Sequence, residues 1–245
     1  MGTDRWPVDF RYISSRLVRQ IVQQDEASRS RWCLSTTFRL PGAVIRPEKR
    51  PLRYDNKFAL CREATEAVRD NTSTIAQGWG DYIRAELDIE MGLLTVFMGW
   101  KSKTHVQIAA MKAEVTDPDQ GRMLVALFGS ASNYTGRKSL DDGLAEIPSD
   151  VDGLYGILER TREPGEPEID DHYLDRDIGH SPSSRADTAI KLLRDCFSGF
   201  RTEYCDVLIK TFCIVNEGTK PYGRVILGAP VWVATPEPKP MTDLK

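Results

Sequence analysis

The segment RMLVALFGS, residues 122–130, limits the fold more than any other part of the sequence. It is almost wholly apolar, which is typical of a strand that is buried on both faces. The preceding TDPDQG, 116–121, is rich in the residues that turns need, and THVQIAAMKAEV, 104–115, alternates as a strand does. The three segments together predict two antiparallel neighbours in a sheet.

Periodicity and turn residues predict the remaining elements. Pro41 and Gly42 end one strand, Met91 and Gly92 separate two strands of a hairpin or meander, and Ser14 or Ser15 is the N-cap of the first helix. The predicted strands are 8–14, 31–40, 81–91, 93–100 and 223–235, and the predicted helices are 14–30, 55–70, 150–163 and 184–200.

The segment EYCDVLIKTFCIVNEG, 203–218, is ambiguous between strand and helix. We favour a helix, because one helical face would carry Leu208, Thr211, Phe212 and Val215. Gly218 stands where a C-terminal cap glycine belongs. In the last strand, Gly228 and Pro230 predict a bulge or a close approach to the backbone, more often by another strand than by a ligand.

These elements predict an α+β fold, with a mixed, largely antiparallel sheet and helices packed on it. The chain of 245 residues, 40% of them hydrophobic, is long enough to bury one substantial core. We expect a single α+β domain over 1–235 with an acidic polar loop at about 164–183, followed by a proline-rich tail at 236–245.

Composition narrows the classes of partner. The net charge of -3 gives no basic surface for a phosphate backbone, so nucleic acid is not expected. The longest apolar run, ILGAPVWVA, is shorter than the ~18 residues of a membrane span, so no membrane partner is expected either. Five cysteines without C-x-x-C spacing are typical of free thiols in a reducing compartment, and we expect a cytoplasmic protein.

Five stretches also resemble a known family. RYISSRLV, YIRAELDIEMG with VFMGW, LVALFGSASNYTG, VLIKTFCIVNEG and RVILGAPVWVA occur in the order found in an uncharacterised actinobacterial family, the DUF7019-type family, of which the chain resembles a divergent member. The resemblance implies one domain and a bacterial cytoplasmic setting, and it implies no chemistry. Where the family pattern has histidine beside the glycine and serine, this chain has Asn133 and Tyr134.

The segment FGSASNYTGRK, 128–138, supplies the groups that phosphate-binding loops use: glycines, hydroxyls, an amide and two cations. It matches neither the P-loop nor the dinucleotide-binding motif, and a plain loop after a buried strand is the simpler interpretation. The predicted ligand-binding residues are Gly129, Ser130, Ser132, Asn133, Thr135 and Arg137.

The loop EIDDHYLDRDIGH, 168–180, is dense in carboxylates and holds two of the three histidines. These groups suit a divalent metal, although their spacing matches neither H-E-x-x-H nor an EF-hand, and a solvated loop is the alternative. The candidate metal ligands are Asp171, His172, Asp175 and His180.

A third set lies in RAELDIE, where Arg84, Glu86, Asp88 and Glu90 alternate with apolar residues. Paired carboxylates can divide acid and base roles, but the pattern is also that of a sheet with one solvated face, which we prefer. No G-x-S-x-G motif is present, and most of the cysteines have apolar neighbours, as small hydrophobic residues do.

Three functions remain open, of which the binding protein and the scaffold rank nearly level and the enzyme ranks behind them. The first is a binding or regulatory protein for a small anionic ligand, such as a nucleotide, without an evident catalytic constellation. The second is a metal-dependent hydrolase or transferase that uses the acidic loop, with a divalent metal as cofactor. The third is a scaffold that forms a homo-oligomer or binds a protein partner, and the sequence does not decide whether the protein is an enzyme.

Overall fold

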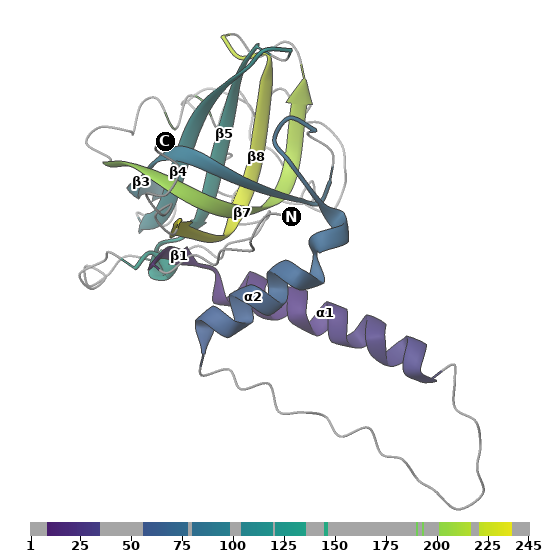
Figure 1. The fold of residues 1–245 in the computed structure, drawn as a ribbon. Helices are drawn as coiled ribbons and strands as arrows, with labels where there is room; N and C mark the ends of the chain where they lie inside the picture. Colours follow the sequence, from purple (N-terminus) through teal and green to yellow (C-terminus); the bar gives the residue numbers. More distant parts are fainter. Residues whose placement is uncertain are drawn as a thin grey trace, which may run out of the picture.

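A computed structural model describes ten parts of the chain, in which five long strands and two helices carry the architecture (Figure 1). The described residues are 9–34, 56–77, 80–98, 104–119, 121–135, 145–146, 190, 193, 201–216 and 221–236. The strands are β1 (Asp9–Ile13), β2 (Thr72–Ser73), β3 (Tyr82–Met98), β4 (Thr104–Asp117), β5 (Gly121–Ser130), β6 (Ala145–Glu146), β7 (Arg201–Asn216) and β8 (Arg224–Thr235). The α-helices are α1 (Ser15–Leu34) and α2 (Lys57–Ala67).

The long strands close into a barrel. Their hydrogen-bonded order is β3-β7-β8-β5-β4, and β4 pairs again with β3, so the ring has no open edge. All neighbours are antiparallel except β5 and β8, which are parallel. The predicted α+β fold is therefore wrong: strands dominate the described chain, and the two helices contact a barrel instead of covering an open sheet.

The strand order is that of a Greek key. Three consecutive strands, β3, β4 and β5, form a meander, and β7 returns by a long connection to lie beside β3. The last strand, β8, closes the ring between β7 and β5. A five-stranded Greek-key barrel is the architecture of the OB-fold, which hosts many functions, so the fold by itself assigns none here.

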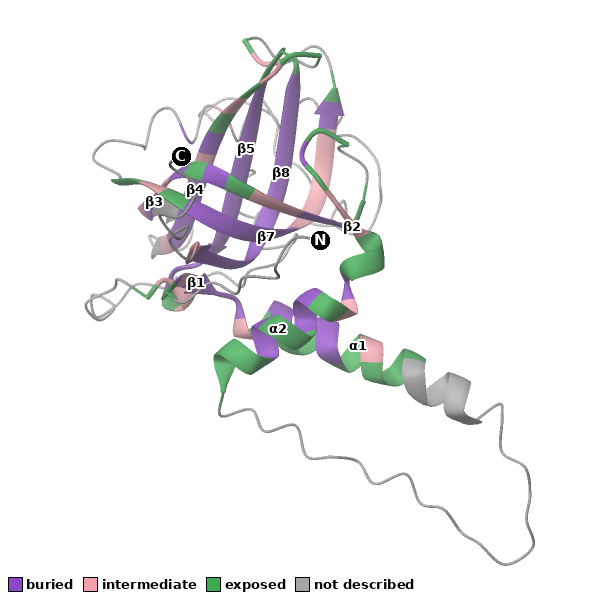
Figure 2. Cartoon of the chain, in the orientation of Figure 1, coloured by how far each residue is buried: buried purple, intermediate pink, exposed green. Residues whose placement is uncertain are grey.

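Side chains fill the barrel, as expected for one with so few strands. Along β5, Met123, Val125 and Leu127 belong to the inner cluster, whereas Leu124 and Phe128 belong to a second cluster with Leu193. Both faces of β5 are thus covered, and β8 is likewise buried along almost its whole length (Figure 2). This double coverage explains why RMLVALFGS is almost wholly apolar.

The helices pack on each other and on β1 and β8 (Figure 1). The predicted apolar stripe of α1 is confirmed, since Leu17, Val18, Ile21 and Val22 are buried in one cluster with α2 and Trp232. None of the helices among the described residues is long and apolar enough to cross a membrane.

The bulge predicted near Pro230 is confirmed and positions α1. The register runs from Leu208 opposite Trp232 to Ile209 opposite Pro230, which leaves Val231 as the extra residue. The carbonyl of Val231 accepts a 2.9 Å hydrogen bond from the backbone N–H of Ser14. Ser14 is one of the two predicted N-caps, and its Oγ accepts a 3.4 Å hydrogen bond from the N–H of Leu17.

The helix predicted at 203–218 is wrong, because 201–216 is strand β7. Cys205, Val207 and Ile209 face the barrel interior, whereas Leu208 faces the helices. A strand buried on both faces is a continuous apolar run, and a short run of that kind fits a helical stripe as well as a strand. The β-branched residues of the segment favour the strand.

Two boundaries were also predicted wrongly. The hairpin at Met91 and Gly92 does not exist, because β3 continues through Gly92, which lies opposite Ala110 of β4. Residues 31–34 of the predicted strand 31–40 instead complete α1.

Three predicted segments lie wholly or largely outside the described residues. Of the predicted helix 184–200, only residues 190 and 193 are described, and both are helical. The acidic loop at 164–183 and residues 237–245 of the tail lie outside the described residues.

Candidate functional site

The candidate ligand loop begins where β5 ends. β1 and β5 both pair with β8. β5 pairs with the first half of β8 and β1 with the last residues of β8, so β1 and β5 lie nearly end to end. The segment after β5 forms a 3-10 turn, Ala131–Asn133, and then reaches β1, where Tyr134 forms an isolated antiparallel bridge with Tyr12. Gly129, Ser130, Ser132, Asn133 and Thr135 are thus placed by the junction of β1 and β5, and Arg137 lies outside the described residues.

Part of this loop serves the contact with β1. A Cβ atom at Gly129 would overlap the hydroxyl of Tyr12, so glycine is required there by a side chain of the protein itself. Asn133 Nδ2 donates a 3.3 Å hydrogen bond to the same hydroxyl. Thr135 Oγ1 lies 2.8 Å from the carbonyl oxygen of Phe10, to which it donates. Gly129 and Thr135 therefore have structural roles that account for their identity.

The two serines contribute to an open depression beside α1. The hydroxyls of Ser130 and Ser132 are 2.8 Å apart, and both residues line a depression of about 700 Å³. Its other wall is the first half of α1, whose exposed residues recur with the spacing of one helical face. The described lining residues are Ser15, Arg16, Arg19, Gln20, Gln23, Ser130, Ser132 and Asn133.

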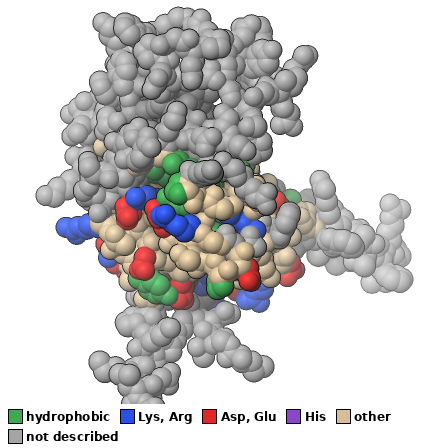
Figure 3. All heavy atoms as spheres, turned by 90° about the horizontal axis from the view of Figure 1, so that it is seen from above, with side chains coloured by type: hydrophobic (Ala, Val, Ile, Leu, Met, Phe, Trp, Pro, Cys, Tyr) green, Lys and Arg blue, Asp and Glu red, His purple; other side chains and the backbone are tan. Residues whose placement is uncertain are grey.

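Two arginines line the depression. Arg16 and Arg19 bring two guanidinium groups, and none of the lining residues that the structure describes is acidic. The depression also includes the N-terminal turn of α1, where the helix dipole favours an anion. On the face drawn in Figure 3, by contrast, acidic and basic side chains are interspersed over the described surface.

Sequence reasoning found Ser130, Ser132 and Asn133 and missed the arginines. Arg16 and Arg19 are more than a hundred residues away from the loop, on the polar face of a helix that was interpreted only through its apolar stripe. The available signal was the pair of cations three residues apart, because such residues lie on one face of a helix.

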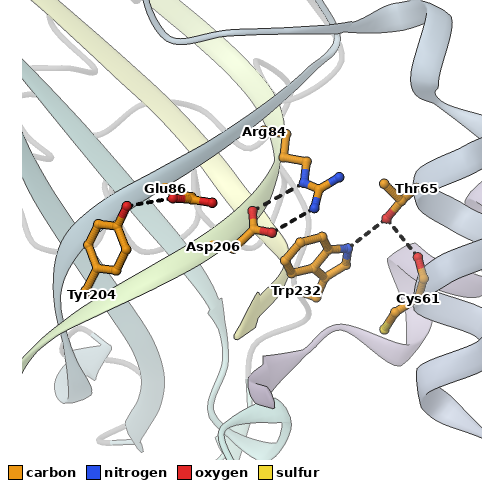
Figure 4. A network of polar contacts seen from close by, with 7 residues as sticks. All are labelled: Cys61, Thr65, Arg84, Glu86, Tyr204, Asp206 and Trp232. Atoms are coloured by element: carbon orange, nitrogen blue, oxygen red, sulfur yellow. Dashed lines mark hydrogen bonds and ion pairs between the residues drawn. The ribbon is translucent and has the colours of Figure 1, made fainter. Parts of the chain in front are cut away.

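The alternating strand RAELDIE has a solvated face, as expected, and its residues Arg84 and Glu86 have polar partners (Figure 4). Arg84 makes two hydrogen bonds to Asp206, of 2.8 and 3.3 Å, and its guanidinium lies 5.6 Å from the ring centroid of Trp232. Tyr204 donates a 2.6 Å hydrogen bond to Glu86, which raises the pKa of the tyrosine. These contacts serve the barrel wall and form no acid–base pair.

Two of the thiols are buried and protonated. Cys61 and Cys205 are fully buried, and burial raises the pKa of each from 9.0 to about 12. A thiol attacks as the thiolate, so neither residue is suited to nucleophilic catalysis at neutral pH. The interpretation of these two cysteines as small hydrophobic residues is confirmed.

The metal hypothesis falls on residues that the structure does not describe. Asp171, His172, Asp175 and His180 all lie outside the described residues. Within the part of the chain that the structure describes, no group of three or more histidine, cysteine or carboxylate side chains is arranged to hold a metal ion.

Comparisons with known proteins identify no relative: no protein-family model, curated protein or solved structure matches the chain. The resemblance to the DUF7019-type family therefore depends on the five quoted stretches alone.

Proposed function

We propose that this protein binds a small anionic ligand in the depression between α1 and the end of β5. One observation carries the proposal: Arg16 and Arg19 line the same depression as Ser130, Ser132 and Asn133. Guanidinium groups form charge-assisted, often bidentate hydrogen bonds with phosphate or carboxylate. Hydroxyl and amide groups add the neutral donors that fix an anion's orientation.

The described lining favours binding over catalysis. The lining residues that the structure describes include no histidine, cysteine or carboxylate, which are the usual general bases and nucleophiles. A binding or regulatory role follows from this set. A ligand held by both walls would stabilise the contact between α1 and the junction of β1 with β5.

Thermal unfolding with and without ligand tests the proposal. A ligand that binds only the folded protein stabilises it by about 2.7 kcal/mol at a hundredfold excess over Kd. We expect inorganic phosphate, or a phosphate ester, to raise Tm in wild type and to have little effect in Arg16→Ala/Arg19→Ala. Arg69→Ala is the matched control, since Arg69 is exposed and paired with Glu66 away from the depression.

The same experiment separates the alternatives. An equal phosphate effect in wild type and in the double variant would contradict the proposal. A divalent metal that raises Tm in wild type and not in His172→Ala would favour the metal-dependent hydrolase or transferase. If no anion or metal changes Tm, the proposal fails, and light scattering would then test the homo-oligomeric scaffold.

A further inference from the structure

The lining of the depression also constrains the rest of the ligand. All eight lining residues that the structure describes are polar, with no aromatic or aliphatic side chain among them. Pockets for ligands with a flat apolar ring are lined mainly by hydrophobic and aromatic side chains, on which the ring stacks. A flat ring could stack only on the guanidinium planes of Arg16 and Arg19, whereas hydrogen-bonding groups occur along the whole described lining, so this lining offers more to hydroxyl groups than to a ring.

The depression has room for more than a lone phosphate ion. Its volume of about 700 Å³ lies in the range of roughly 300–1,000 Å³ that holds whole small molecules. Along α1 the lining runs from Ser15 to Gln23, a rise of about 12 Å. A phosphate group held by the arginines would leave most of this length to the remainder of the ligand.

Two glutamines continue the arginine face along α1. Gln20 follows Arg16 by four residues, and Gln23 follows Arg19 by four, so each amide lies about one turn beyond a guanidinium. Both side chains are exposed and line the depression. A carboxamide both donates and accepts, which suits hydroxyl groups, since a hydroxyl also does both.

We propose that the ligand is a phosphorylated polyol of the sugar-phosphate class, whose phosphate lies at Arg16 and Arg19 and whose hydroxyls contact Gln20 and Gln23. This inference depends on the proposed function of the same depression. It adds the class of ligand and assigns the two glutamines to recognition of hydroxyl groups.

Calorimetric titration of the full chain with four probes tests the ligand class: inorganic phosphate, ribose, ribose 5-phosphate and adenosine 5′-monophosphate. We expect ribose 5-phosphate to bind at least tenfold more tightly than phosphate and at least as tightly as the nucleotide. Ribose alone should bind more weakly than ribose 5-phosphate. Equal affinity for phosphate and ribose 5-phosphate would overturn the inference, as would a nucleotide that binds tenfold more tightly than ribose 5-phosphate.

Variants assign the two ends of the depression. Gln20→Ala/Gln23→Ala should weaken the binding of ribose 5-phosphate by about tenfold, which corresponds to the loss of one or two hydrogen bonds. The same variant should leave the binding of phosphate unchanged. Arg16→Ala should weaken the binding of both phosphate and ribose 5-phosphate. Gln24→Ala is the matched control, since Gln24 is exposed on the same helix and does not line the depression. Unchanged ribose 5-phosphate affinity in the double glutamine variant would overturn the role of the glutamines.

Different results would contradict the anion site and the class of ligand. If phosphate binds through the arginines and the sugar adds nothing, only the ligand class is wrong. If none of the four probes binds, the proposed anion site fails, and the ligand class fails with it.

Discussion

The indole Nε1–H of Trp232 donates a 3.1 Å hydrogen bond to Oγ1 of Thr65, and this bond joins β8 to α2 (Figure 4). Both residues are buried, and Oγ1 of Thr65 in turn donates a 2.8 Å hydrogen bond to the carbonyl of Cys61. The hydroxyl thus satisfies two buried polar groups at once. This contact adds a polar link to the apolar cluster that holds the helix pair against the barrel.

Replacing Thr65 by valine should lower the free energy of unfolding by about 1–3 kcal/mol, because the side chain keeps its shape while the indole N–H of Trp232 loses its acceptor. Urea unfolding followed by tryptophan fluorescence measures the change. Thr65→Ser keeps the hydroxyl and should be the more stable of the two variants. A valine variant as stable as the serine variant would show that the hydrogen bond contributes little.

The ion pair between Arg84 and Asp206 should matter more than a surface pair. The Asp206 side chain is only 7% exposed and that of Arg84 33%, so Arg84→Ala leaves a buried carboxylate without its partner. We expect a loss of about 2–4 kcal/mol in unfolding free energy, and a smaller loss in Arg84→Lys, which keeps the charge but not the bidentate contact.

A double-variant cycle isolates the coupling of this pair. Arg84→Ala/Asp206→Asn should be more stable than the sum of the two single losses predicts, because no charge is then left buried alone. Simple additivity in urea unfolding would mean that the two side chains do not interact.

Gly228→Ala should be more destabilising than Gly129→Ala. A Cβ at Gly228 would lie 2.6 Å from the carbonyl oxygen of Lys210, which is backbone of the neighbouring β7, whereas at Gly129 it would meet the side chain of Tyr12. A strand fixed by pairing on both sides moves less easily than a side chain, so we expect about 3 kcal/mol at Gly228 and about 1–2 kcal/mol at Gly129.

Tyr12→Phe provides the control for this comparison. It removes the nearest contacting atom and should partly restore the stability of Gly129→Ala, while it cannot restore that of Gly228→Ala. Rescue of both variants, or of neither, would contradict the steric explanation.

The buried thiols should make stability fall at alkaline pH. Burial raises the pKa of Cys61 and Cys205 from 9.0 to about 12, so above pH 9 the unfolded chain releases protons that the folded chain retains. The stabilisation is complete below pH 9 and is lost as the pH rises toward 12. Between pH 8 and 10 the unfolding free energy should drop by about 1.4 kcal/mol for each thiol.

Urea unfolding at the two pH values measures this drop, and Cys61→Ala/Cys205→Ala is the comparison. The variant should be less stable at pH 8 but should lose less stability on going to pH 10. An identical loss in wild type and variant would assign the pH dependence to other groups, such as Tyr222, whose pKa burial raises to about 12.

Local patterns predicted the individual elements well where one face is apolar and the other is not. The helix at α1 follows from a 3.6-residue period, with Ser14 as one of two candidate N-caps, and strand β4 follows from alternation before a turn. Periodicity failed at β7, because burial on both faces removes the alternation that distinguishes a strand from a helix. It failed at Gly92 because nothing local shows that β4 pairs across a glycine.

The same distinction between local pattern and tertiary structure applies to the candidate site. The sequence by itself determined that a strand ends in small polar residues, since Ser130, Ser132 and Asn133 follow an apolar run, and that α1 has a polar face. Only the tertiary structure decided that these polar residues line one depression with Arg16 and Arg19 of α1, and that the strands close into a barrel. The physical reason is that local periodicity records which face of an element is buried, whereas hydrogen bonding and packing between distant segments decide what buries it.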